Sequence, residues 1–282
     1  EALEYATIPA PPWARRTGLL RELIAVEGRY RRHGRAWRLH LDNTKSTITA
    51  AAALCERHRT ALVLGSGALY DIPLAHLAAR FDRVVLVDAA HPWRARAAAL
   101  RFRNVVHVHA DLSGVCDALL LGVAAGADTP PDPRISPIPD VAPDHVDLVV
   151  SANLMSQLPL IPIAFVQRYL PFSTDAEARF ARSILQAHLD FIHAFPAVSC
   201  LITDRTRETI DRDGAPVRVN GALYGLDLPN PDREWIWDIA PIGEISRTEA
   251  GRNRVLAITR PPVINKTPHR DARRLDSLGP QA

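Results

Sequence analysis

The chain has 282 residues, of which 47% are hydrophobic and 23% charged, and its formal net charge is +3. These proportions are typical of a globular protein and exclude a disordered chain, and the length suits one large α/β domain with additions or two small ones. No apolar run approaches the length of a membrane span. Cys55, Cys116 and Cys200 are far apart and form no CxxC pair, so we expect a cytoplasmic protein without disulfides or a zinc site.

The N-terminal part of the sequence predicts helices. A helix is expected from about Arg15 to Arg38, and a second one through Ile48 to His58, capped by Asp42, Asn43 or Thr44. We interpret residues 1–43 as a helical extension that covers the main domain.

Arginines cluster in this extension. An RNA-binding arm and the solvated face of an ordinary helix both have this composition. Because no glycine repeat accompanies the arginines, we favour the solvated face, and a small-molecule or protein partner over nucleic acid. The arginines are Arg15, Arg16, Arg21, Arg29, Arg31, Arg32, Arg35 and Arg38.

The most informative stretch runs from Thr60 to Asp111. An apolar strand, residues 61–64, leads into a Gly-x-Gly turn, a helical segment at 72–80 and a second strand, 84–87, that ends on Asp88. A short helix, about 93–102, precedes a third strand at 104–109. Strand, glycine turn, helix and strand with a terminal acid is the pattern of a nucleotide-binding βαβ unit.

Each residue of this pattern has a chemical reason. Gly65 and Gly67 let the backbone turn sharply and approach a ligand closely. A helix that begins near Asp71 would direct its unpaired N–H groups toward the turn. Asp88 is placed to accept hydrogen bonds from both ribose hydroxyls, and Asp111 from an adenine amino group.

The kind of nucleotide is restricted by the next residues. Tyr70 occupies the position where a dinucleotide fingerprint has Gly or Ala. The Gly-Lys-Ser/Thr of a P-loop is absent. At this point the sequence resembles class I S-adenosylmethionine-dependent methyltransferases, with Leu64-Gly65-Ser66-Gly67 and Asp71-Ile72-Pro73-Leu74 similar to a poorly characterised bacterial branch. Residues 146–153 resemble the fourth strand of that superfamily.

The resemblance covers about residues 44–260 and implies a set of cofactor contacts. Val63 and Leu69 depart from the family pattern, in which an acid and a third glycine often stand. The resemblance implies that the following residues bind S-adenosylmethionine: Gly65, Ser66, Gly67, Asp71, Asp88, Ala89, Asp111, Leu112, Ser151 and Asn153.

The rest of the chain fits such a domain. We expect a helix at 115–125, a Pro-rich insertion at about 126–143, a strand at 146–152, and prolines at a turn and helix start in 158–162. Ser173 or Thr174 should cap a helix at 175–194, and a fifth strand, 197–203, should end at Asp204. Alternating strands at 234–239 and 254–259 predict a C-terminal antiparallel hairpin, and residues 261–282 a mobile tail.

We therefore predict an α/β fold with a Rossmann-like, mostly parallel seven-strand sheet, and methyl transfer to an unidentified acceptor. Asn153, Gln157 and Asp204 follow strand ends and are candidate acceptor contacts, with His40 and Lys45 from the covering helices. A non-catalytic binding or assembly protein remains an alternative, which the departures at Val63 and Leu69 favour. An NAD-dependent oxidoreductase is a weaker one.

A metal site is not expected. His107 and His109 alternate along a strand as two ligands can, but the sequence shows no third ligand at a suitable spacing.

Overall fold

A computed structural model describes residues 2–170 and 173–262 of the chain. The helices are α1 (Ala2–Thr7), α2 (Pro12–Thr17), α3 (Leu19–Ala53), α4 (Leu74–Arg80), α5 (Trp93–Ala99), α6 (Cys116–Ala124), α7 (Leu160–Tyr169) and α8 (Thr174–His193), with short 3-10 turns η1 (Pro143–His145) and η2 (Met155–Gln157). The strands are β1 (Thr60–Leu64), β2 (Arg83–Asp88), β3 (Val105–His109), β4 (Val146–Ala152), β5 (Val198–Ile210), β6 (Pro216–Gly221), β7 (Arg233–Ala240) and β8 (Ala250–Arg260).

The strands form one mixed sheet in the order β3-β2-β1-β4-β5-β8-β7. The first five are parallel, whereas β8 runs antiparallel to both β5 and β7. The predicted Rossmann-like α/β fold with an antiparallel C-terminal pair is confirmed. The sheet has an eighth strand that we did not predict, because β6 pairs only with the extended second half of β5 and all six of its residues are exposed.

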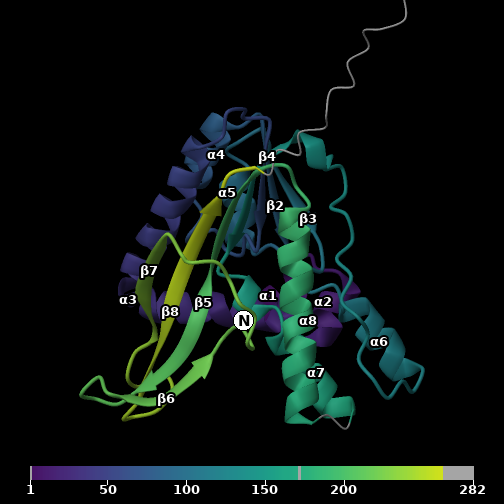
Figure 1. Cartoon of the computed structure of the whole chain (residues 1–282), viewed down its shortest axis with the longest axis vertical. Coiled ribbons are helices and arrows are strands. Elements are labelled where there is room, and N and C mark those ends of the chain that lie inside the picture. The colour runs from purple at the N-terminus through teal and green to yellow at the C-terminus, as the bar shows by residue number, and fades with distance from the viewer. Residues whose placement is uncertain (1, 171–172, 263–282) are drawn as a thin grey trace, which may run out of the picture.

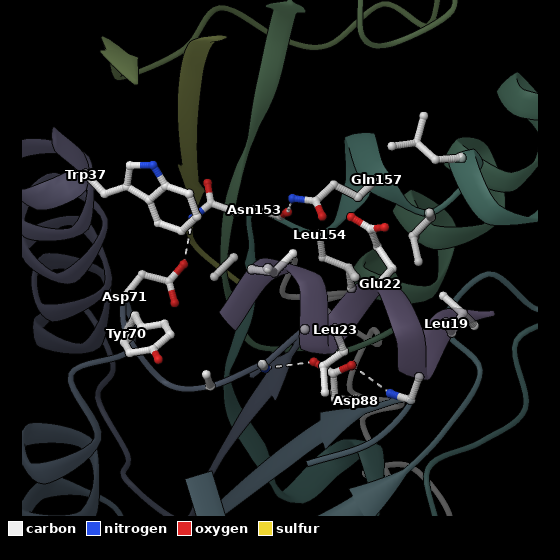
Figure 2. A pocket seen from close by; sticks show the side chains of 18 of the residues that line it. Leu19, Glu22, Leu23, Trp37, Tyr70, Asp71, Asp88, Asn153, Leu154 and Gln157 are labelled. Atoms are coloured by element: carbon white, nitrogen blue, oxygen red, sulfur yellow. Dashed lines mark hydrogen bonds between the residues drawn. The ribbon is translucent and has the colours of Figure 1, made fainter. Parts of the chain in front are cut away.

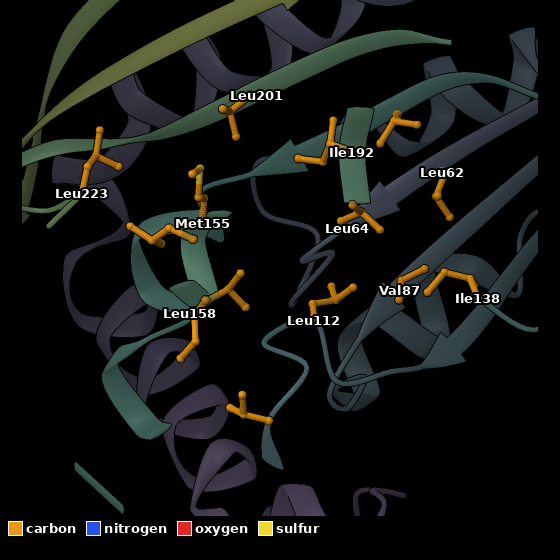
Figure 3. Packing of buried hydrophobic residues seen from close by; sticks show 14 of the residues in the cluster. Leu62, Leu64, Val87, Leu112, Ile138, Met155, Leu158, Ile192, Leu201 and Leu223 are labelled. Carbon is orange, nitrogen blue, oxygen red and sulfur yellow. The ribbon is translucent and has the colours of Figure 1, made fainter. Parts of the chain in front are cut away.

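Helices cover both faces of the sheet (Figure 1). One hydrophobic core lies between the sheet and helices α6, α7 and α8. Figure 3 shows the centre of this core, around Leu64, Val87 and Met155. A second core lies under α3 and α4, with Val63 fully buried in it. Strands buried on both faces are expected to carry apolar runs, and β1 and β4, buried along their whole length, have such runs at 61–64 and 148–150.

The predicted break between two N-terminal helices was wrong. Helix α3 continues through Asp42, Asn43 and Thr44 without interruption. Its buried positions recur at helical spacing from Trp37 to Ala52, so tertiary packing overrides the capping preference of these polar residues. The boundary at residue 43 therefore falls within a helix, and the division into an extension and a main domain stays a prediction.

Two further boundaries differ from those expected. Strand β5 does not end at Asp204 but continues to Ile210, because β6 and β8 pair with its second half. Helix α4 begins at Leu74 after Pro73, several residues beyond the glycine turn. The N-cap of α8 at Ser173 and the loop at 126–142 agree with the prediction. Most of the predicted tail, residues 263–282, lies outside the described residues. Among the described residues, no helix is long and apolar enough to cross a membrane.

Candidate functional site

A cavity of about 350 Å³ opens at the carboxyl ends of the parallel strands. It is bounded by the turn after β1, the end of β2, the end of β4, the N-terminal half of α3, and β7. In open α/β sheets this edge is where ligands bind. Figure 2 shows α3 lying across the cavity, with Leu23 next to Asp88 and Leu19 farther along the helix.

Asp88 holds the glycine turn. One carboxylate oxygen accepts a hydrogen bond of 2.7 Å from the backbone N–H of Gly67, and the other accepts one of 2.7 Å from the N–H of Ala89. Desolvation nevertheless raises the pKa of Asp88 to about 6. Besides the ribose contact expected from the sequence, this carboxylate has a structural role, because it fixes the shape of the turn.

The turn itself depends on glycine at one position. Gly65 has φ 77°, and a Cβ there would lie 2.7 Å from the Cβ of Leu154. Leu69 adopts φ 64°, the left-handed conformation, although it is not a glycine. A residue that holds this conformation without being Gly stores roughly 1–2 kcal/mol of strain. Leu69 therefore keeps a glycine-like backbone conformation at the position where the family often has a third glycine.

At the end of β4, Asn153 connects two elements. Its side-chain N–H donates a 2.7 Å hydrogen bond to Asp71, and its backbone oxygen accepts one of 2.7 Å from the side chain of Gln157. Its own φ is 53°. Burial raises the pKa of Asp71, and the bond from Asn153 opposes that shift. Asp71, Asn153 and Gln157 all line the cavity.

Aromatic residues form the wall beneath α3 and β7. The rings of His40 and Trp237 are stacked, with centroids 4.0 Å apart and planes 4° apart. The indole N–H of Trp235 donates a 3.0 Å hydrogen bond to Nδ1 of His40. Burial lowers the pKa of His40 to about 3, so the imidazole is neutral at physiological pH. Trp37 packs edge-on against Trp237.

The structure brings together most of the predicted site residues: Gly65, Gly67, Asp71, Asp88, Ala89, Asn153, Gln157 and His40 all line the cavity. Lys45 does not line it, although its charge lowers the pKa of Asp71.

Five other predicted residues lie outside the cavity lining. Asp111 accepts hydrogen bonds from the backbone N–H groups of Ser113 and Cys116 at the start of α6, and Leu112 is in the core. Buried Ser66 and Ser151 face His91 and His188. Asp204 is buried inside β5, where it accepts a hydrogen bond from Ser156.

Sequence reasoning missed the contribution of the covering helix. Glu22 and Leu23 of α3 line the cavity, as do Trp37 and Trp237. The sequence offered one signal for Glu22, which is that it stands with Arg21 in the otherwise apolar stretch Leu19-Leu20-Arg21-Glu22-Leu23-Ile24.

The charge of the cavity lining is one-sided. Glu22, Asp71 and Asp88 contribute carboxylates, whereas no Lys or Arg is among the lining residues. Carboxylates near a site favour cations and disfavour anionic ligands.

His107 and His109 of β3 lie close to His91, but the three rings do not form a set of metal ligands. The ring of His91 is 4.4 Å from that of His107 and 5.2 Å from that of His109, between centroids. Within residues 2–170 and 173–262, no three His, Cys, Asp or Glu side chains are arranged to hold a metal ion.

Comparison with known proteins gives distant structural matches only. No family model matches the chain, and no curated protein does. The 1,6-didemethyltoxoflavin-N1-methyltransferase of Burkholderia thailandensis, solved with S-adenosylhomocysteine, is 13% identical over 86% of this chain and 90% of its own, with a TM-score of 0.34.

Two further solved structures are comparably distant. The precorrin 8w decarboxylase of Methanobacterium thermoautotrophicum is 14% identical over 77% of this chain and 90% of its own, with a TM-score of 0.29. The 23S rRNA methyltransferase ErmE is 14% identical over 78% and 70%, with a TM-score of 0.27. At these TM-scores the function has to be inferred from the site itself.

Proposed function

We propose that the protein transfers a methyl group from S-adenosylmethionine to an acceptor bound under α3. The observation that carries this proposal is the combination of the Asp88-held glycine turn with a cavity that has three carboxylates and no Lys or Arg side chain in its lining. S-adenosylmethionine brings a sulfonium cation and an ammonium group, which such a lining stabilises.

Asp88 is the residue that we assign to the ribose. A carboxylate has about four lone-pair positions, and the backbone N–H groups of Gly67 and Ala89 occupy two of them. The remaining two can accept the ribose hydroxyls. The adenine would pack on Leu19 and Leu23 of α3, in place of the contact with Asp111 that the sequence suggested.

Asp71 is the residue that we assign to the amino group of the cofactor. Val63, where the family often has an acid, is fully buried in the core and reaches no ligand. Asp71 instead places a carboxylate in the cavity, oriented by the hydrogen bond from Asn153. A cation near Asp71 would also offset the cost of burying this carboxylate.

An NAD-dependent oxidoreductase is less consistent with this site. In a dinucleotide fold the helix follows the glycine turn directly and its N-terminus binds the pyrophosphate. Here α4 begins only at Leu74, and carboxylates rather than basic groups line the cavity. Both features disfavour a pyrophosphate.

The remaining alternative is a protein that binds the cofactor without using it. Incubation with methyl-labelled S-adenosylmethionine and a small-molecule extract separates an enzyme from a non-catalytic binding protein. The control is the double variant Asp71→Asn, Asp88→Asn. An enzyme transfers label to an extract component, and the double variant does not. Tight cofactor binding without any transferred label would instead support the non-catalytic alternative.

The acceptor side follows from chemistry and position. In-line methyl transfer needs the acceptor atom near the sulfonium, so positioning supplies much of the catalysis. Asn153 and Gln157 lie at the end of β4, between Asp88 on β2 and Trp237 on β7 in the strand order. We therefore place the reacting methyl group beside Asn153 and the acceptor toward His40. We also propose a cytoplasmic, bacterial setting with a small molecule or protein as partner rather than nucleic acid.

A further inference from the structure

The cavity lining contains carboxylates but no cationic side chain that can pair with an anionic ligand group. Glu22, Asp71 and Asp88 are its acidic residues, and neither Lys nor Arg is among the lining residues. His40 supplies no cation, because burial lowers its pKa to about 3. Asp71 and Asp88 are near enough to each other for the charge of Asp71 to raise the pKa of Asp88. A ligand carboxylate buried here would lose water and gain no ionic partner.

The backbone of the glycine turn offers little to an anion either. In nucleotide-binding folds, the N–H groups of such a turn and of the helix after it often bind a phosphate or a carboxylate. Here the N–H groups of Gly65, Ser66, Gly67 and Leu69 all donate to other atoms of the protein. Helix α4 begins only at Leu74, several residues beyond the turn. The turn therefore keeps its shape with hydrogen bonds that an anionic ligand would need.

Two basic side chains stand near the cavity without lining it. The charge of Lys45 lowers the pKa of Asp71. The guanidinium of Arg94 lies 4.9 Å from the centroid of the Tyr70 ring, and the ring of Tyr30 is stacked on Tyr70 at 3.5 Å between centroids. Both cations thus act on the site from outside its lining.

Asp71, by contrast, is well placed to bind an ammonium group. Its Oδ2 accepts the 2.7 Å hydrogen bond from the side chain of Asn153, which fixes the orientation of the carboxylate (Figure 2). Asp71 is half-buried and lines the cavity, so a ligand can reach it. In an α-amino acid the ammonium and carboxylate groups share one carbon atom. An amino acid that binds Asp71 through its ammonium therefore brings its carboxylate into the same anionic lining.

We propose that this cavity recognises the amino group of its adenosyl ligand but not the carboxylate. The ligand that it binds best is then an S-adenosyl compound that ends in a primary amine, such as decarboxylated S-adenosylmethionine. This inference rests on the proposed function, because it concerns the same site and the same class of cofactor. Decarboxylated S-adenosylmethionine carries the same methylsulfonium group, so the inference concerns binding and leaves the transferred methyl group unchanged.

Three ligands without a reactive sulfonium separate the two groups. S-adenosylhomocysteine has both the amine and the carboxylate, S-adenosyl-3-thiopropylamine has the amine alone, and 5′-methylthioadenosine has neither. Calorimetry with the full chain at neutral pH measures each affinity. We expect the amine to bind about tenfold or more tightly than S-adenosylhomocysteine, because no unpaired carboxylate is buried. It should also bind about tenfold or more tightly than 5′-methylthioadenosine, because it adds a hydrogen bond between charged groups.

Variants assign each difference to a side chain. Asp71→Asn should weaken S-adenosyl-3-thiopropylamine and S-adenosylhomocysteine about tenfold each and leave 5′-methylthioadenosine unchanged, since only the ammonium contact is lost. Asp82→Asn, at an exposed position outside the cavity lining, is the matched control and should change none of the three affinities. Loss of S-adenosylhomocysteine affinity alone in Lys45→Gln or Arg94→Gln would show that one of these cations binds the carboxylate, which would overturn the inference.

The same titrations distinguish failure of this inference from failure of the proposed function. If none of the three ligands binds the wild-type chain, the proposed function falls and the inference falls with it. If S-adenosylhomocysteine binds as tightly as the amine, or more tightly, the inference alone is wrong. Equal affinities for the amine and 5′-methylthioadenosine would show that Asp71 does not bind the amino group.

Discussion

Asn153 and Asp71, which are far apart in the sequence, are joined by a 2.7 Å hydrogen bond in the lining of the cavity. The bond places a carboxylate with a raised pKa beside the end of β4. A buried carboxylate that destabilises its own fold is typical of a functional position rather than a structural one.

Replacing the charge at Asp71 should therefore separate stability from binding. Asp71→Asn keeps an oxygen that can accept from Asn153 but removes the desolvated charge. We expect an unchanged or higher melting temperature together with at least about tenfold weaker binding of S-adenosylhomocysteine, the usual worth of a hydrogen bond to a charged group. Asp82→Asn, at an exposed position just before β2, is the control and should change neither quantity. A large loss of stability with normal binding would show that Asp71 is structural.

Replacement of Asp88 should affect both stability and cofactor binding. Asp88→Ala removes the acceptor for the N–H groups of Gly67 and Ala89. We expect the free energy of unfolding to fall by about 1–3 kcal/mol and cofactor affinity to fall at least tenfold, roughly. Calorimetry and thermal unfolding of the same variant measure the two effects. Full cofactor affinity in this variant would refute the ribose assignment.

Gly65 can be tested against a glycine with the same backbone but open surroundings. Gly65 and Gly126 have φ of 77° and 74°, yet a Cβ at Gly126 would meet nothing within 4 Å, whereas one at Gly65 would collide with Leu154. Both alanine variants lose roughly 1–2 kcal/mol from the left-handed backbone, and Gly65→Ala should lose roughly 1–3 kcal/mol more from overpacking. Chemical denaturation gives both values. Equal losses would mean that the turn after β1 relaxes freely.

Stability should fall as the pH drops below about 6.5. Burial lowers the pKa of His40, His91 and His188 to about 3. Below the ordinary pKa of 6.5, the unfolded chain binds protons that the folded chain does not, which costs up to about 1.4 kcal/mol per pH unit for each histidine. Asp88, with its pKa raised to about 6, works in the opposite direction between about pH 6 and 4, and burial raises the pKa of Asp71 and Asp204 in the same sense. Burial also lowers the pKa of His107 and His109, so five histidines outnumber three carboxyl groups.

Urea midpoints between pH 7 and pH 4 measure this effect. His188→Gln, which can keep a polar contact to Ser151, should flatten the profile. A midpoint that is constant or rises over this range would contradict the burial of these histidines as neutral groups.

The sequence was sufficient for the local pattern of the fold. Apolar runs, the glycine turn and the strand-end acid identified the βαβ unit, and Asp88 and Gly67 do meet. Caps and periodicity also located α8, which Ser173 caps. These features depend on neighbours that are close in the sequence or on the fixed geometry of parallel strands.

The predictions that were wrong concern features that depend on long-range packing. Thr44 is a favourable N-cap residue, but its burial under the sheet keeps it in the middle of α3. Asp111 was expected in the cofactor site, but hydrogen bonds to Ser113 and Cys116 turn it toward the start of α6. The pairing of Trp235 with His40, 195 positions away, cannot be read from either residue alone.

Most of the early arginines lie on a solvated helix face, with Arg35 and Arg38 exposed and Arg31 paired with Glu4 and Glu27, whereas Arg15 is half-buried and donates to the backbone oxygens of Tyr5 and Ile8. We predict that nucleic acid binds weakly and that the affinity falls steeply with salt. Filter binding with a mixed RNA pool over a salt series measures this. Tight, salt-resistant binding to a defined RNA would show that the arginines form a specific interface.

The central claim is that the cavity beneath α3 binds S-adenosylmethionine. Isothermal titration calorimetry of the wild-type chain with S-adenosylhomocysteine, and separately with NADH, tests it most directly. The carboxylate lining and the Asp88-held turn predict micromolar-range binding of S-adenosylhomocysteine and no detectable heat with NADH. Binding of NADH without any response to S-adenosylhomocysteine would contradict the claim.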